Sequence, residues 1–464
     1  DCQDSKPCVM RAARHLRLRR FLEQHPEERE RRVVNERTRV ANFSSQQRAS
    51  VEQRWRAVTG NPACLNDCGL KGACVKGLCV CADGWVGLDC MSRSTLSDVP
   101  DSGGFMYVVD VPAHQGHMQM RGAYKGAYGD AIYHSEVVFT GRLMRDWSLR
   151  TLKRAEAKLF YVPTWMYYTQ NNVLNGDHRY RELLNLQLPG NASQRVFYFS
   201  GDRGACGVPR GSTFISHWGL TVPWKHRSDP QNRNSSRDGE PCAVPGSDII
   251  VPMYFHFNHT GATQLSRREY ECDLFFAGSY GPPGCRGKEC DDPHYSQGVR
   301  QMVKEQHGKR RGFCLFKRAP NTYFSRSRFC LISSGNGFGS RLYHAMNYNC
   351  VPVIIQPAVM QPFEGIVPYE RFSLRFSHAD IPRLHTLLRN VSAEAHWQMR
   401  RQLAIWRHAL DWNELAYDLV KYELCLRAGL SCTSLRTGWE SKLDAVADQV
   451  LGLGRVVRER SRSL

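Results

Sequence analysis

The sequence lacks any run of about 18 consecutive apolar residues, the length that a membrane-spanning helix needs. It also lacks metal-ligand spacing, because His117, His256 and His259 are scattered; we predict no metal site and expect core or surface histidines. The chain begins with Asp1 and not with Met, which we interpret as a processed or trimmed form. A signal peptide or a membrane anchor upstream is compatible with that interpretation, and the sequence does not choose between them.

Acidic residues are scarce relative to basic ones, with 44 Asp and Glu against 63 Lys and Arg. Between Arg11 and Arg56 there are thirteen arginines and six glutamates, and the tail after Arg455 is also basic. Such a balance attracts anions, including nucleic acid, acidic glycans and membrane surfaces. A solvated, arginine-rich helix face without a dedicated partner is the favoured alternative, and we predict no nucleic-acid partner.

Cysteine is abundant, and its distribution indicates an oxidising compartment. The chain has eighteen cysteines, six of them packed between Cys64 and Cys90. Five N-x-S/T triplets support the same interpretation, because each is an acceptor for N-glycosylation; they begin at Asn42, Asn191, Asn234, Asn258 and Asn390. We therefore predict residence in the secretory pathway or outside the cell.

Four changes in composition predict five regions along the chain. Residues 1–62 have helical periodicity but too few apolar positions for a core, so we expect a basic, helical stem. Residues 63–91 are a cysteine-rich module too short to fold without disulfides, for which spacing alone allows fifteen pairings. The remaining boundaries are expected at 92–262, 263–400 and 401–464, the last holding helices and a basic tail.

Apolar runs alternate with helical stretches from about Gly104 onward. The runs are continuous, as expected for parallel strands buried on both faces: 105–109, 158–162, 195–199, 248–251, 273–277, 329–333 and 351–355. Helices are expected at 134–150, 340–349 and 380–389. This alternation predicts α/β architecture, and about 350 residues are too many for one compact sheet. We therefore expect two Rossmann-like halves, with irregular segments at 225–247 and at 279–298, where Cys285 and Cys290 could pair locally.

The segment 329–355 has the strongest chemical signal. A strand is followed by a loop with Gly335, Asn336, Gly337 and Gly339, and Ser340 and Arg341 then open a helix. Glycines allow backbone N–H groups to approach an anion, and arginine supplies a planar, bidentate phosphate donor. Because ligands of open α/β sheets bind at the carboxyl ends of strands, this loop predicts a diphosphate site. The alternative is a structural loop with Arg341 contacting a neighbouring segment.

Two resemblances accompany these patterns. The blocks Ser327–Leu331, Gly339–Leu342 and Asn349–Ile355, with 361–364 (QPFE) after them, resemble the exostosin family of glycosyltransferases. Looser matches occur at 155–163, 201–206, 217–219 and 274–278, so that the likeness covers roughly 104–410. The six-cysteine spacing resembles EGF-like modules, which implies pairs Cys64–Cys74, Cys68–Cys79 and Cys81–Cys90. The combination is similar to exostosin-like proteins of green algae.

The exostosin resemblance implies a two-domain GT-B fold and an inverting transfer from a nucleotide-sugar, with a UDP-sugar as the expected donor. It assigns the diphosphate to Arg341 and the 335–340 amides, and a ribose hydroxyl to Glu364, whose alternative is a surface carboxylate near Arg371. His344 stands where the family usually has Asp or Glu, so the donor contact differs there. No D-x-D triplet occurs, and arginine can replace a metal in this fold, so we predict no divalent ion and no other cofactor.

A single displacement needs one general base on the acceptor side. Asp202 is the first candidate because it follows the strand 195–199; Asp130 and Glu136 are rivals, and an ion pair of Asp202 with Arg203 or Arg210 is the structural alternative. We therefore expect a Golgi-lumenal (or secreted) transferase acting on a glycan or glycoprotein acceptor, with a paired transferase subunit as a further partner. The alternative function is a non-catalytic, EGF-bearing glycan-binding or adhesive protein.

Overall fold

The computed structural model describes the following residues: 72–75, 78–82, 85–86, 89–90, 92–93, 103–109, 111, 131–164, 176–223, 240–258, 269–281, 295–335 and 337–451. The predicted stem, Asp130, Asn336, Asn42, Asn234, His117, His259 and the Cys285–Cys290 pair lie outside these residues. None of the helices within the described ranges has the length and hydropathy to cross a membrane.

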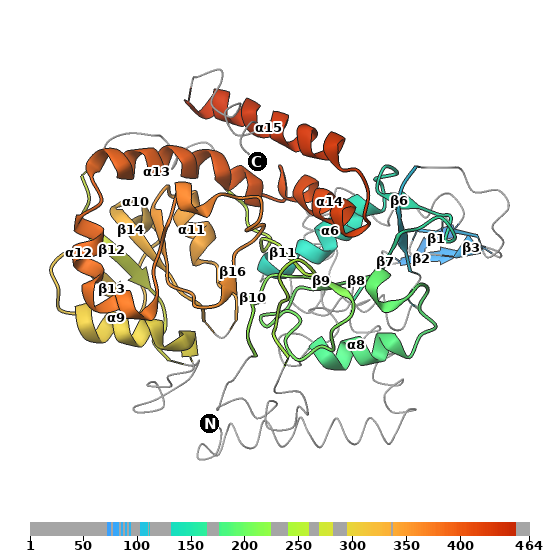
Figure 1. Ribbon diagram of the computed structural model, residues 1–464, viewed down its shortest axis with the longest axis horizontal. Helices are drawn as coiled ribbons and strands as arrows, with labels where there is room; N and C mark the ends of the chain where they lie inside the picture. Colours follow the sequence, from blue (N-terminus) through green and yellow to red (C-terminus); the bar gives the residue numbers. More distant parts are fainter. Residues whose placement is uncertain are drawn as a thin grey trace, which may run out of the picture.

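Two parallel sheets form the body of the molecule (Figure 1). The first has six strands in the order β11-β9-β8-β7-β5-β6, and every pairing in it is parallel. Its strands are β5 (Met106–Val108), β6 (Arg150–Thr151), β7 (Leu159–Val162), β8 (Arg195–Phe199), β9 (Thr213–Ser216) and β11 (Ile249–Ile250). We call this half the N-terminal lobe.

The second sheet has five parallel strands in the order β13-β12-β14-β15-β17 and forms the C-terminal lobe. Its strands are β12 (Cys272–Ala277), β13 (Phe313–Phe316), β14 (Ser327–Ile332), β15 (Val351–Ile354) and β17 (Leu374–Arg375). The prediction of two parallel α/β halves is therefore confirmed, although the predicted domain boundaries stay predictions.

Alternating side chains of each central strand bury opposite faces of its sheet. In β14, Phe329 and Leu331 pack with α9 (Val299–His307) and α12 (Leu384–Arg389), whereas Cys330 and Ile332 join the core around α11 (Arg341–Asn347). In the N-terminal lobe, β8 directs Phe197 toward α8 (Gly176–Leu184) and Tyr198 toward α6 (Ser135–Leu143). Burial on both faces explains why these strands read as continuous apolar runs.

The C-terminal helices connect the lobes. After α13 (Ala393–Trp406) the chain returns to the N-terminal lobe, where Trp412 donates from Nε1 to the carbonyl oxygen of Pro252 at 2.8 Å. Lys421 on α14 (Ala416–Arg427) pairs with Asp146 at 2.7 Å, and α14 lies beside α6 in Figure 1. The last helix described is α15 (Thr433–Leu451), which packs on α13 and α14.

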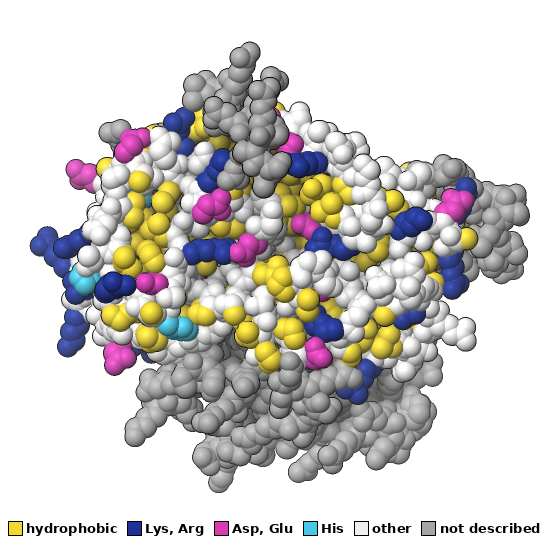
Figure 2. Space-filling model, in the orientation of Figure 1, with side chains coloured by type: hydrophobic (Ala, Val, Ile, Leu, Met, Phe, Trp, Pro, Cys, Tyr) yellow, Lys and Arg dark blue, Asp and Glu magenta, His cyan; other side chains and the backbone are white. Residues whose placement is uncertain are grey.

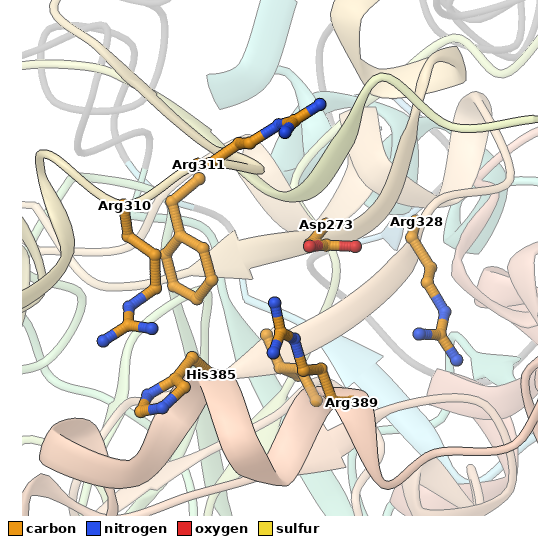
Figure 3. Close-up of a pocket in the computed structure, with 8 residues that line it drawn as sticks. Asp273, Arg310, Arg311, Arg328, His385 and Arg389 are labelled. Carbon is orange, nitrogen blue, oxygen red and sulfur yellow. The ribbon is translucent and has the colours of Figure 1, made fainter.

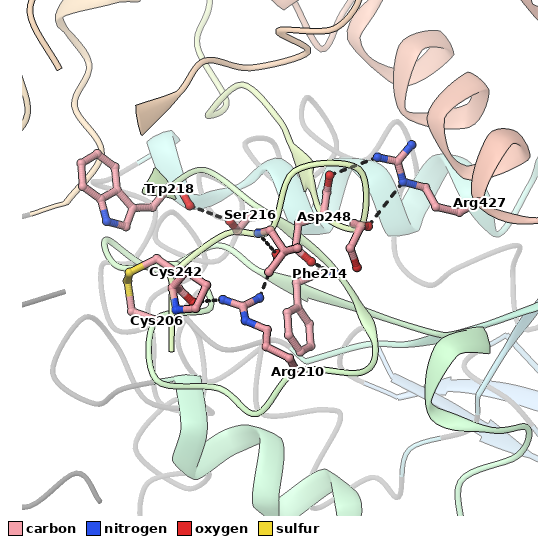
Figure 4. A network of polar contacts seen from close by, with 11 residues as sticks. Cys206, Arg210, Phe214, Ser216, Trp218, Cys242, Asp248 and Arg427 are labelled. Atoms are coloured by element: carbon pink, nitrogen blue, oxygen red, sulfur yellow. Dashed lines mark hydrogen bonds and ion pairs between the residues drawn. A yellow bond between two sulfur atoms is a disulfide. The ribbon is translucent and has the colours of Figure 1, made fainter. Parts of the chain in front are cut away.

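A polar network anchors α14 to the end of the first sheet (Figure 4). Arg427 donates to the carbonyl oxygens of Ser247 and Asp248, and the Asp248 carboxylate pairs with Arg210 at 2.8 Å. Burial raises the pKa of Asp248, and the Arg210 guanidinium lowers it in opposition. The sequence alternative in which Asp202 pairs with Arg210 is therefore wrong, because Arg210 pairs with Asp248; its other form, with Arg203, stays a prediction.

Four disulfides join described cysteines, and the sequence predicted none of these pairs: Cys206–Cys242, Cys272–Cys314, Cys330–Cys350 and Cys425–Cys432. In the cysteine-rich module two short antiparallel ladders are described, β1 (Gly72–Val75) with β2 (Leu78–Cys81) and β3 (Trp85–Val86) with β4 (Ser92–Arg93). Cys90 is disulfide-bonded. The three pairs implied by the EGF-like resemblance stay predictions, because the side chains of the other five cysteines lie outside the described residues.

Two predicted helices differ from the structure. The helix expected at 134–150 ends at Leu143, and the chain turns through 144–149 into strand β6. The helix expected at 380–389 is divided into a 3-10 segment, His378–Arg383, and α12, because Pro382 cannot donate to a continuous helical ladder. Strands β9 and β13 were not predicted.

Candidate functional site: an arginine pair at the edge of the second sheet

Two arginine side chains meet at the carboxyl ends of β12 and β14. Arg341 opens α11 and donates from Nε to the carbonyl oxygen of Ala277 at 3.0 Å. Arg300, near the start of α9, donates to the carbonyl oxygen of Ser279 at 2.8 Å and to the hydroxyl of Ser333 at 3.1 Å. These acceptors lie at the last residue of β12 or within two residues after the ends of β12 and β14, which is the position where ligands of open α/β sheets bind.

Both guanidinium groups lie close to one aromatic ring, that of Phe276. The Phe276 ring has the Arg341 Cζ atom 4.7 Å from its centroid and the Arg300 Cζ atom 5.2 Å from it. Gly278 gives Arg341 its space, because a Cβ at that position would lie 1.8 Å from an Arg341 terminal nitrogen. Arg300 also receives support from Tyr295, whose hydroxyl oxygen accepts from it at 2.9 Å.

Neither guanidinium has a carboxylate partner within the described part of the chain. Burial lowers the pKa of Arg341, and the positive charge of Arg300 lowers it further. Burial likewise lowers the pKa of Arg300. Two neighbouring cations that repel each other and donate to neutral oxygens have the charge and the donors to bind an anion.

The glycine loop lies beside the arginine pair, but it offers fewer amides than expected. The Gly335 amide donates to the Gly337 carbonyl at 3.3 Å, and the Phe338 amide donates to the Asp202 carbonyl at 3.1 Å. These two amides are therefore engaged within the protein, and the assignment of a diphosphate to the 335–340 amides stays a prediction. Gly339 and Ser340 remain next to Arg341, and Ser340 makes no side-chain cap to α11.

His344 follows Arg341 by one helical turn and has aromatic neighbours. Its ring lies 5.0 Å from Phe255, edge to face, and 5.7 Å from Phe324, stacked. Burial and the charge of Arg341 lower its pKa, so the imidazole is neutral at neutral pH. A neutral, aromatic-lined position replaces the carboxylate that the resemblance leads one to expect.

Glu364 is engaged within the C-terminal lobe. One carboxylate oxygen accepts from the Gln361 amide at 2.6 Å, and the other pairs with Arg375. Arg375 is thus the ion-pair partner of Glu364, and the expected proximity to Arg371 stays a prediction. Gln361 continues the polar chain through Gln356 to Ser334, at the ends of β15 and β14.

Asp202 and Glu136 occupy different positions in the N-terminal lobe. The Asp202 carboxylate accepts from the Tyr133 hydroxyl at 2.5 Å, and its backbone contacts the glycine loop of the other lobe. Glu136 is fully buried, where its carboxylate accepts from the Thr164 amide at 2.9 Å and from the Ser200 hydroxyl at 3.3 Å. Of these two predicted bases, only Asp202 lies where the lobes meet.

The remaining predictions concern glycosylation acceptors and metal ligands. Asn191, Asn258 and Asn390 are all exposed, so each sequon is accessible where it is described. Across the described chain no three or more His, Cys, Asp or Glu side chains gather as metal ligands would. His256 is exposed.

A small hollow lies at the amino-terminal end of the C-terminal sheet, opposite the end that holds the arginine pair (Figure 3). Asp273 at the start of β12 lies among basic side chains, which are Arg310, Arg311, Arg328, His385 and Arg389. Lys and Arg side chains project at this edge, over α9 and α12, in Figure 2. The hollow is separated from the arginine pair by the length of the strands.

Two facing parallel α/β lobes with a cationic site at the strand ends define the class of GT-B-like glycosyltransferases. Comparison with known proteins gives the family: the Exostosin GT47 domain model matches residues 102–391. The chain therefore belongs to the exostosin GT47 family.

Several proteins of similar sequence come from plants. A probable glucuronoxylan glucuronosyltransferase of Arabidopsis thaliana is 26% identical over 346 residues, which are 66% of this chain and 68% of that protein. A probable glucuronosyltransferase of Oryza sativa subsp. japonica is 30% identical over 169 residues, 35% of this chain and 39% of the relative. A probable beta-1,4-xylosyltransferase of Arabidopsis is 30% identical over 115 residues, 24% of this chain and 28% of the relative. The chain thus spans well under half of two of these relatives.

Proposed function

We propose that this protein is an inverting glycosyltransferase that moves a sugar from a nucleotide-sugar, with a UDP-sugar as the donor, to a glycan or glycoprotein acceptor. The observation that carries this proposal is the pair Arg300 and Arg341, two neighbouring guanidinium groups without a carboxylate partner in the described chain. A diphosphate has the charge and the several oxygens that such a pair would bind.

The arrangement suggests how the chain would perform a single displacement. The acceptor hydroxyl oxygen forms a bond to the anomeric carbon while the bond from that carbon to the diphosphate oxygen breaks. The departing electron pair stays on the diphosphate, where Arg341 and Arg300 stabilise the developing charge. Asp202, at the meeting of the lobes, is our candidate for accepting the hydroxyl proton.

Several finer parts of the proposal rest on the residues around the pair. Two fixed cations already supply positive charge at the leaving group, so we propose that no divalent ion is required. His344 and its aromatic neighbours would contact the nucleoside, and Glu364 would reach a ribose hydroxyl only if it left Arg375. We further propose an EGF-like module in front of the transferase, a Golgi-lumenal setting (secretion being the alternative) and a second transferase subunit as partner.

A nucleotide screen on the purified protein tests the proposal. A functional donor site raises the unfolding temperature with UDP or its sugars, with stabilisation growing as RT ln(1 + [L]/Kd). Release of UDP from a series of UDP-sugars, with and without EDTA, then identifies the donor and tests the metal proposal. Arg341→Ala should abolish transfer while the protein still folds and is secreted; full turnover in that variant removes Arg341 from the mechanism. A non-catalytic glycan-binding protein would bind no nucleotide at all.

A further inference from the structure

The N-terminal lobe holds the 335–340 loop of the C-terminal lobe, which we call the donor loop after its proposed function. Phe338, in the middle of this loop, places its ring 5.8 Å from that of Tyr133, edge to face, and 4.9 Å from that of His217. Its backbone amide donates to the Asp202 carbonyl at 3.1 Å. All three contacts cross between the lobes, from a loop that begins at Gly335 beside Arg300 and ends at Arg341.

The close approach of the two backbones depends on Gly337. This residue has a φ of +149°, and a Cβ there would lie 2.1 Å from the Asp202 carbonyl oxygen. A side chain would therefore push the loop away from the N-terminal lobe. The glycine in this loop serves contact with protein, in addition to any contact with a ligand.

The groups that receive Phe338 are themselves fixed. The Tyr133 hydroxyl donates to the Asp202 carboxylate at 2.5 Å, which links two of the three contacts. The His217 Nε2 atom lies 2.7 Å from the Ser135 hydroxyl, and burial lowers the pKa of His217 to about 3. The receiving surface is thus neutral at His217, and its two aromatic side chains, Tyr133 and His217, are each held by a hydrogen bond.

A second crossing follows directly along the chain. Two residues after His217, β10 (Gly219–Leu220) pairs antiparallel with β16 (Val359–Met360) of the C-terminal lobe. Phe338 and Val359 both pack against Trp218 and Leu220 in one apolar cluster. The ladder and the Phe338 contacts therefore form one continuous junction between the lobes.

We propose that Phe338 is a positioning residue through which the N-terminal lobe sets the conformation of the donor loop, so that nucleotide binding and lobe closure are coupled. This inference rests on the proposed donor site. If the lobes separate, the loop loses Phe338's partners and the start of α11, where Arg341 lies, is released with it. By linkage, a nucleotide that needs the ordered loop must in turn favour the closed junction.

Binding of UDP, measured by calorimetry without acceptor, tests this coupling. Phe338→Ala should raise the Kd for UDP about tenfold, within the range of coupling between sites, and Phe338→Leu should raise it less. Tyr133→Phe changes only the N-terminal lobe and touches neither arginine, yet it should also weaken UDP binding. Met399→Ala, a half-buried apolar side chain of the C-terminal lobe core, is the matched control and should leave Kd unchanged.

Hydrogen exchange gives a readout that a merely structural role would not change. In the wild type, UDP should increase protection of the peptide 213–220 in the N-terminal lobe; in Phe338→Ala that increase should be lost. Wild-type affinity in both Phe338→Ala and Tyr133→Phe, with unchanged protection of 213–220, overturns the coupling while the donor site stands. Absence of UDP binding in the wild type overturns the proposed donor site, and the coupling with it.

Discussion

Asp89 of the cysteine-rich module and Arg150 at the start of β6 form a two-pronged ion pair that is buried on both sides. Arg150 donates from both terminal nitrogens to the two carboxylate oxygens, one of them at 2.9 Å, and also to the Met144 carbonyl at 2.8 Å. The side chains are 0% and 2% exposed, so water cannot replace either partner. This buried ion pair thereby fixes the module to the N-terminal lobe.

We expect Asp89→Ala to reduce the free energy of unfolding by about 3–5 kcal/mol, because Arg150 would become a buried charge without its partner. Urea unfolding followed by fluorescence measures this. Replacing both residues, as Asp89→Leu with Arg150→Met, should recover most of the loss. A double variant as unstable as Asp89→Ala would show that the attraction within the pair exceeds the free-energy cost of burying the two charges.

Replacing Arg341 of the proposed donor site should separate its effect on the stability of the fold from its effect on nucleotide binding. Arg341→Met keeps an apolar stem over Phe276 but removes a partly buried cation that repels Arg300. We expect an unfolding temperature equal to or above that of the wild type, together with a UDP Kd raised about 100-fold, equivalent to about 2.7 kcal/mol. Differential scanning fluorimetry and calorimetry measure the two effects. A marked loss of stability would instead indicate a structural role for Arg341.

Stability should fall as the pH is lowered from 6.5 toward 5. Burial lowers the pKa of His217 to about 3, well below its ordinary value of 6.5, so the unfolded chain binds a proton in this range and the folded one does not. This group alone should cost about 2 kcal/mol over 1.5 pH units. His217→Gln should show a shallower dependence of unfolding temperature on pH. Equal slopes for both proteins would contradict a neutral, buried His217.

The disulfide Cys330–Cys350 joins β14 to the residue before β15, across the 335–340 loop and α11, with a sequence separation of 20 residues. Replacing both cysteines by alanine should lower the free energy of unfolding by about 3 kcal/mol. The pair Cys425–Cys432 spans seven residues and is the control, since closing a shorter loop restricts the unfolded chain less. Thermal unfolding of both double variants compares them, and a larger loss in the control would argue against this chain-entropy account.

The parts of the fold that could be predicted from sequence are those with a continuous local signal. Buried strands such as β8 and β14 are apolar throughout, and the block from Ser340 to Ile354 has both helix and strand signals at its boundaries. Strand β9 (TFIS) is short and half polar, so it does not differ locally from a loop; β13 (FCLF) is a four-residue apolar run at the edge of its sheet and was not predicted. The turn through 144–149 into β6 contains no Gly or Pro that would have indicated it.

For a related reason, only one of the two arginines of the candidate site could be predicted from the sequence. Arg341 could be found because it follows a glycine loop in the chain, whereas Arg300 comes from α9 and meets it only through folding. A sequence feature that could have indicated the site is Gly278, which comes directly after a strand and whose lack of a side chain makes room for Arg341. Phe338 and the Glu364–Arg375 pair likewise depend on three-dimensional neighbours that no local spacing encodes.

The return of the chain through Trp412 and α14 to the first lobe has a practical meaning for engineering. A C-terminal half excised at the boundary between the sheets would carry Trp412 and α14 without their hydrogen-bond and ionic partners, Pro252 and Asp146. A hybrid transferase that exchanges acceptor halves between family members must therefore move α14 together with the N-terminal sheet. Two crossover points, one on each side of the second sheet, would preserve these contacts where a single fusion point would not.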